Sequence, residues 1–109
     1  MVDITNRPFQ EGDILLEIYQ GGRITLPHVV HGGFTPLYIR TVCIFSGGGL
    51  TFKSRVKPKS VIIVTEEQFL GFVDKRVENR RGIDGFSEVR TRETYNKLLQ
   101  LSRRLKAER

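Results

Sequence analysis

The chain has 109 residues, of which 39% are hydrophobic and 28% are charged, and it carries a formal net charge of +6. This length predicts a single domain with a modest core, and the composition excludes an intrinsically disordered chain. The apolar runs are too short to span a bilayer and the N-terminus lacks the apolar segment of a secretory signal, so we expect a cytoplasmic protein with no membrane partner.

The N-terminal part of the chain predicts two antiparallel strands. Over residues 14–19 the side chains alternate between two faces, with the period of a half-buried strand. A glycine-rich turn at residues 20–22 then leads into a returning strand at residues 23–30. Pro27 lacks a backbone N–H, so we expect part of that strand to lie at a sheet edge. Residues 31–36 predict a loop.

Three more strands are expected before the helical part. Residues 37–45 are β-branched and aromatic as in a central strand, and a glycine-rich turn at residues 46–49 leads to a strand at residues 50–57. Pro58 ends that strand, and the apolar residues 61–64 suit a strand covered on both faces. The alternation in the fourth strand places Leu50, Phe52, Ser54 and Val56 on one face and Thr51, Lys53, Arg55 and Lys57 on the other.

Two amphipathic helices should complete the chain. Thr65 and Gln68 have the spacing of a capping box, and the first helix would end where Gly82 provides a left-handed cap. Gly71 weakens that helix, so we expect a close neighbour there. A linker at residues 82–90 precedes a second helix capped by Thr91. The expected apolar stripes are Phe69, Leu70, Val73 and Val77 in the first helix, and Tyr95, Leu98, Leu99, Leu101 and Leu105 in the second.

These elements predict an α+β fold in one domain, residues 1–109. Residues 11–64 would form a small SH3-like or Tudor-like β-barrel of about five antiparallel strands, because a meander of this size usually closes to hide its edges. Residues 65–109 would form the two C-terminal α-helices that follow the barrel.

Positive charge is concentrated in the second half of the chain. Residues 1–52 contain three basic and four acidic residues, whereas residues 53–109 contain fifteen basic and eight acidic ones. The net charges are therefore −1 and +7. A field of this sign attracts nucleic acid or an acidic protein surface.

Two groups of basic residues are the candidate binding sites for DNA, RNA or an acidic protein partner. Along a strand, every second cation would lie about 6.6 Å from the next, a spacing that could follow a phosphate backbone. The alternatives are a solvated sheet face, pairing of the helical arginines with nearby acids, and simple core packing for the basic C-terminal helix. The strand group is Lys53, Arg55, Lys57 and Lys59, and the helix group is Arg76, Arg80 and Arg81.

Catalytic and metal chemistry have little support in the sequence. His28 and His31 would lie on opposite faces of a strand, and no third ligand supports a metal site, so we expect no metal and no cofactor. Cys43, the only cysteine, lies in an apolar run and is interpreted as a buried hydrophobic residue. Glu17 with either histidine is the one possible acid–base pair. If exposed, Tyr19, Phe34 and Tyr38 could stack on bases, although aromatic residues in strands more often pack across strands.

The C-terminal half resembles the PII-interacting protein X family, small cyanobacterial coactivators of transcription. The matching residues are Val73–Val77, Arg80–Arg81 and Tyr95–Leu98. This resemblance implies a Tudor-like barrel followed by a helical pair, and an adaptor that bridges regulatory proteins without catalysis. The segment Glu11–Ile14 is similar to the start of ribonuclease toxins with SH3-like barrels.

We therefore predict a non-enzymatic regulatory binding protein that acts in transcription or on nucleic acid through its basic half. One alternative is a protein–protein adaptor that docks an acidic partner. The other is a metal-independent ribonuclease on an SH3-like barrel.

Overall fold

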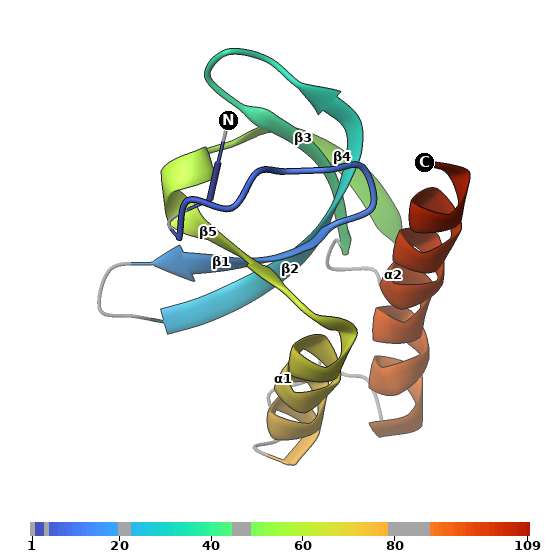
Figure 1. The fold of residues 1–109 in the computed structure, drawn as a ribbon. Helices are drawn as coiled ribbons and strands as arrows, with labels where there is room; N and C mark the ends of the chain where they lie inside the picture. The colour runs from blue at the N-terminus through green and yellow to red at the C-terminus, as the bar shows by residue number, and fades with distance from the viewer. Residues whose placement is uncertain (1, 4, 20–22, 45–48, 79–87) are drawn as a thin grey trace.

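The computed structural model describes residues 2–3, 5–19, 23–44, 49–78 and 88–109 (Figure 1). The strands are β1 (Ile14–Tyr19), β2 (Arg23–Phe34), β3 (Ile39–Ile44), β4 (Leu50–Val56) and β5 (Val61–Val64). A short 3₁₀ turn, η1 (Pro58–Ser60), precedes β5, and the helices are α1 (Glu66–Glu78) and α2 (Glu88–Glu108).

The five strands form one antiparallel sheet in the order β4-β3-β2-β1-β5. The first four strands pair with their sequence neighbours, and β5 returns to pair with β1. The predicted α+β class, with five antiparallel strands followed by two helices, is confirmed. The predicted closed barrel is not: the sheet is open, and β4 and β5 are its two edges.

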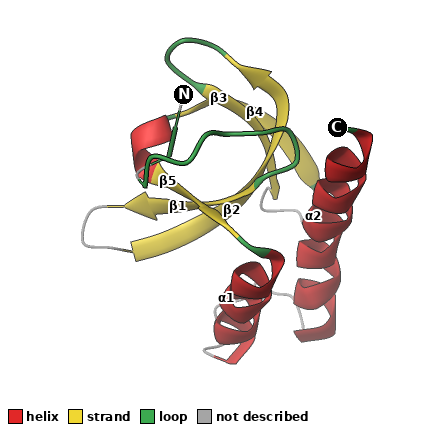
Figure 2. Ribbon diagram, viewed as in Figure 1, coloured by secondary structure: helices red, strands yellow, loops and turns green. Residues whose placement is uncertain are grey.

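Both faces of the sheet are covered, by different parts of the chain. The N-terminal segment crosses one face, where Phe9 packs on the sheet, and the two helices cover the other (Figure 2). Side chains of β5 contribute to both apolar clusters, as its continuous apolar sequence predicted. The first face, called the inner face below, buries Phe9, Leu15, Val30, Ile39, Val56, Val61 and Ile63. The helix-covered face buries Ile14, Leu16, Val29, Val42 and Val64 against Phe69, Val73, Tyr95, Leu98, Leu99 and Leu105.

Strand β2 differs from the prediction in two respects. It lies between β1 and β3 as a central strand, whereas only part of it agrees with the expected edge: within the described pairing, the residues up to Pro27 pair with β1 and those from His28 pair with β3 as well. The strand also continues to Phe34, where a loop was expected. Gly32 and Gly33 both adopt positive φ there, and the pairing shifts register between Val30 and Phe34. The glycines thus bend the strand and do not end it. The predicted turns at residues 20–22 and 46–48 lie outside the described residues.

The start of α1 follows its predicted capping box. The backbone N–H of Thr65 donates to Gln68 Oε1 at 2.9 Å, and the backbone N–H of Gln68 donates to Thr65 Oγ1 at 3.1 Å. Two details were wrong. Leu70 is 46% exposed while Phe72 packs on the core, and a Cβ on Gly71 would meet nothing within 4 Å. The predicted cap at Gly82 lies outside the described residues.

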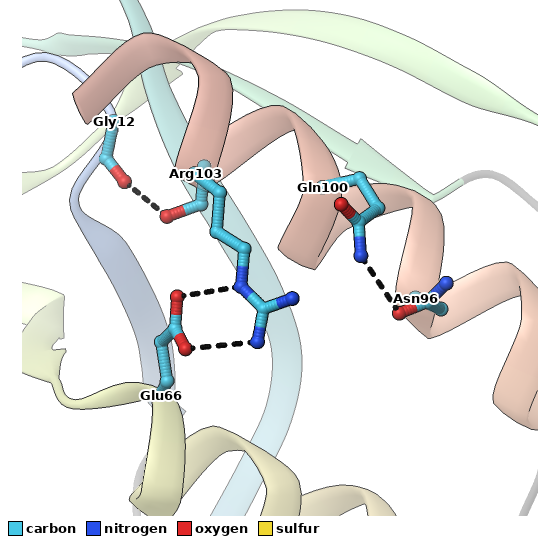
Figure 3. Close-up of polar contacts among 6 residues, drawn as sticks. Gly12, Glu66, Asn96, Gln100 and Arg103 are labelled. Atoms are coloured by element: carbon cyan, nitrogen blue, oxygen red, sulfur yellow. Dashed lines mark hydrogen bonds and ion pairs between the residues drawn. The ribbon is translucent and has the colours of Figure 1, made fainter. Parts of the chain in front are cut away.

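Helix α2 begins at Glu88, three residues before the predicted cap, and its apolar stripe is the predicted one. It is fixed to the start of β1 by Ser102, whose buried hydroxyl donates to the Gly12 carbonyl at 2.6 Å. Figure 3 shows the neighbouring Arg103 bound to Glu66 of α1 by two bonds of 3.0 and 3.1 Å. These contacts join α2 to α1 and to the sheet.

Candidate nucleic-acid interface

A β-bulge in β4 breaks the predicted stripe of basic residues. Ile39 pairs with Val56 and Thr41 with Lys53. Between these two pairs, β3 has one residue and β4 has two, so β4 carries one extra residue. Paired residues point to the same face, and Val56 therefore lies on the same face as Lys53. The alternation that would have aligned Lys53, Arg55 and Lys57 does not hold through this segment.

Lys53 lies instead beside a largely buried polar cluster formed by Glu17, His28 and Thr41. His28 is fully buried, with Nε2 at 2.9 Å from Glu17 Oε2 and Nδ1 at 2.9 Å from Thr41 Oγ1. A carboxylate only accepts hydrogen bonds, so Nε2 carries a proton and the Thr41 hydroxyl donates to Nδ1 of the neutral ring. Of the two pairs considered from the sequence, Glu17 thus meets His28 and not His31.

Burial governs the chemistry of this polar cluster. It lowers the pKa of His28, and the charge of Lys53 acts in the same direction, while the contact with Glu17 opposes them. Burial also raises the pKa of the Cys43 thiol, which faces His28 across the strands. A neutral imidazole beside a protonated thiol is a structural arrangement, and neither group reaches solvent as a nucleophile.

Lys57 and Lys59 line an open groove of about 1100 Å³ at one end of the sheet. They flank Pro58, whose fixed φ suits the first position of the 3₁₀ turn η1. The backbone N–H of Ser60 donates to the Lys57 carbonyl at 3.1 Å and closes this turn. Both lysines are exposed, and among the described residues neither contacts an acid.

The loop between β2 and β3 also lines the groove. Its ends are joined because the backbone N–H of Thr35 donates to the Tyr38 carbonyl at 2.8 Å, and the Tyr38 N–H donates to Thr35 Oγ1. This turn presents Phe34, which is 50% exposed, and Leu37, which is 71% exposed. Phe34 and Tyr38 are two of the three aromatic residues that the sequence suggested for base stacking.

The N-terminal segment also lines the groove, through Val2, Asp3 and Asn6. The carboxylate of Asp3 is 4% exposed and accepts hydrogen bonds from the backbone of Thr5, Arg7 and Ile63. Burial raises the pKa of Asp3, but these bonds outweigh it and leave the pKa below its usual value. The negative charge is therefore turned into the protein, and the groove presents lysines and apolar side chains.

Arg76, the member of the helix group that the structure describes, does not line this groove. Arg76 lies in the last turn of α1, with its guanidinium 5.3 Å from the centre of the Phe72 ring. Strand β5 runs from η1 to α1 and so separates Arg76 from Lys57 and Lys59 (Figure 1). Asp74, one of the nearby acids considered as possible partners of the helical arginines, contacts Arg92 at 2.6 Å. Arg80 and Arg81 lie outside the described residues.

The contact between His31 and Glu11 was not predicted from the sequence, because the two residues are distant along the chain. His31 Nδ1 contacts Glu11 Oε1 at 2.5 Å, and both side chains are about one-third exposed. Burial would raise the pKa of Glu11, but the hydrogen bonds from His31 and from the backbone N–H of Gly32 lower it. The His31 ring also stacks on Phe52, with ring centres 5.7 Å apart.

Within the described part of the chain, no three histidine, cysteine or acidic side chains gather as metal ligands. The same residues contain no helix long and apolar enough to cross a membrane. In comparisons with protein-family models, curated proteins and solved structures, nothing matches this chain.

Proposed function

We propose that this protein binds single-stranded nucleic acid in the groove between η1 and the β2–β3 loop, as a non-enzymatic regulatory protein. The observation that supports this proposal is that exposed Phe34 and half-buried Tyr38 line one groove with Lys57 and Lys59, neither of which contacts an acid among the described residues. Proteins that bind single strands combine stacking aromatic side chains with cations that follow the backbone. The four side chains lie on two short, closed turns, so their arrangement exists before a strand binds.

The groove favours an extended strand over a duplex. Its walls are largely apolar, and Leu37 and Phe34 would contact the faces of bases, which a duplex keeps stacked inside. Each lysine can neutralise one phosphate. We also propose that the sheet is an open relative of the predicted SH3-like or Tudor-like barrel, because β5 returns to pair with β1.

The proposal can be tested by titrating labelled oligouridine and oligothymidine at two salt concentrations. The K57Q/K59Q variant should reduce the slope of log affinity against log salt by about 0.7 for each lysine. Phe34→Ala should cost about 1–3 kcal/mol of binding free energy through lost stacking. The control K75Q/K97Q removes the same charge from exposed positions on α1 and α2 and should leave binding near the wild-type value.

An equal loss in K57Q/K59Q and K75Q/K97Q would show that net charge alone drives binding, and the groove would be the wrong site. Absence of binding at low salt would remove the proposal and favour the adaptor alternative, which the resemblance of α1 and α2 to coactivators also suggests.

The ribonuclease alternative now depends on Glu11 and His31, because Glu17 and His28 are covered. RNA from the same titrations, kept in chelator, should stay intact under our proposal.

A further inference from the structure

A small pocket on the helix-covered face combines an exposed aromatic ring with cations. It holds about 190 Å³ and lies where α2 passes over the ends of β3 and β4. This volume is below the roughly 300–1,000 Å³ of sites that enclose a drug-sized ligand, so it fits one ring system. The pocket is lined by His31, Val42, Leu50, Thr51, Phe52, Leu101 and Arg104.

Phe52 provides a stacking surface in this pocket. It is 71% exposed, an unfavourable position for so large an apolar side chain. One side of its ring rests on His31 at an interplanar angle of 28°. The Glu11 carboxylate fixes the His31 ring by accepting from Nδ1, which leaves Nε2 free to bond a ligand.

Arg104 brings positive charge to the pocket, and a second arginine lies beside the strand segment that carries His31. Arg104 lines the pocket from α2, and Arg40 of β3 reaches the carbonyl of Gly32, the residue after His31, at 3.4 Å. Among the described residues neither arginine contacts an acid. The Glu11 carboxylate, which contacts His31, already accepts hydrogen bonds from His31 and the Gly32 N–H.

From this combination we infer that the pocket binds a nucleotide, with the base stacked on Phe52 and the phosphate held by Arg104. The nucleotide is either a free mononucleotide or one residue of a bound strand. The pocket lies on the opposite face of the sheet from the groove: Val42 belongs to the helix-covered cluster, whereas Phe34 pairs with Ile39 of the inner face. The inference therefore goes beyond the proposed function, and either one can fail alone.

Backbone amide NMR shifts of the full chain, titrated with AMP, adenosine or inorganic phosphate, can test this site. AMP should shift Thr51, Phe52 and Leu101, and adenosine should do so more weakly. Phe52→Leu keeps an apolar side chain but removes the ring, and it should weaken AMP binding roughly 5- to 100-fold. Shifts of Leu37 and Lys59 report the groove separately.

The matched control is the neighbouring arginine. Arg104→Gln should abolish the preference for AMP over adenosine, whereas Arg103→Gln should retain it, because Arg103 is already bound to Glu66. Pocket shifts with AMP but none with an oligonucleotide would identify a free mononucleotide as the ligand, and shifts with both would identify a strand. Absence of pocket shifts at millimolar AMP, or equal shifts in Phe52→Leu, would overturn the inference.

Discussion

Replacing Gly12 by alanine should destabilise the protein more than any other glycine change described here. Gly12 has a φ of +87°, a conformation that costs a residue with a Cβ about 1–2 kcal/mol. The added Cβ would also lie 3.0 Å from Cγ and from the backbone N of Lys106, and 3.1 Å from Cβ of Leu105. Helix α2 would have to move, and overpacking of this kind typically costs about 1–3 kcal/mol.

Two other glycines separate these contributions. Gly33 also has a positive φ, +78°, but its Cβ would meet nothing within 4 Å, so Gly33→Ala should cost only the conformational term of about 1–2 kcal/mol. Gly71 is helical and equally unobstructed. Gly71→Ala should therefore stabilise the protein by up to about 1 kcal/mol.

Urea unfolding of the four proteins measures these differences. The expected order of stability is Gly71→Ala, wild type, Gly33→Ala and Gly12→Ala, with the last about 2–5 kcal/mol below wild type. A loss of this size is a large part of the roughly 5–15 kcal/mol of a typical domain. If Gly12→Ala were no less stable than Gly33→Ala, the close contact between α2 and Gly12 would not exist as described.

Two further predictions concern buried ionisable groups. Asp3→Asn should cost about 1.5–3 kcal/mol, since an amide NH₂ replaces an oxygen that accepts hydrogen bonds from the backbone. Because the folded-state pKa of Asp3 lies below its usual 3.8, wild type should lose this stability as the pH falls below that value. An equal loss of stability at acidic pH in the variant would contradict this prediction. Burial lowers the folded-state pKa of His28, so the unfolded chain takes up its proton first and stability should fall as the pH drops below the usual 6.5. Thermal unfolding between neutral and mildly acidic pH should show that fall in wild type and not in His28→Gln.

Strand positions could be predicted closely because local signals mark them. The alternation of residues 14–19 and Pro58 after β4 gave the bounds of those strands to within about one residue. Pairing was harder, because the bulge in β4 depends on the register with β3 and has no sequence signal of its own. The same holds for Gly32 and Gly33, which bend β2 only because Phe34 pairs again with Ile39.

The prediction of which side chains of α1 are buried was partly wrong for a related reason. The periodicity identified both apolar stripes, but which side of a stripe is buried depends on where α2 lies relative to α1. Leu70 and Phe72 lie on either side of the stripe centre, and Phe72 is the one that meets Tyr95, edge-on at 6.1 Å. The sequence alone contains no information on that choice.

The candidate site could be predicted only in part, because three separated segments build it. Lys57, Lys59, Phe34 and Tyr38 were each identified from the sequence, but as two unrelated groups. Sheet pairing brings them together, because Ile39 pairs with Phe34 on one side and with Val56 on the other. The N-terminal segment also lines the groove, and it is held against β5 by the bond from the Ile63 N–H to Asp3 at 2.8 Å. No local pattern near Asp3 indicates a partner sixty residues away.

Among the described residues, the strand group of basic residues and Arg76 of the helix group do not lie together. Strand β5 begins directly after η1 and leads away to α1, so Lys57 and Lys59 lie at one end of β5 and Arg76 beyond the other. Arg103 and Arg109 contact Glu66 and Asp13, respectively, so their charges are paired within the protein. Two lysines predict a salt slope of about −1.4 for a single strand, whereas seven cations acting together would give about −5. A measured slope near the larger value would require a continuous basic surface and would contradict the separation of these residues.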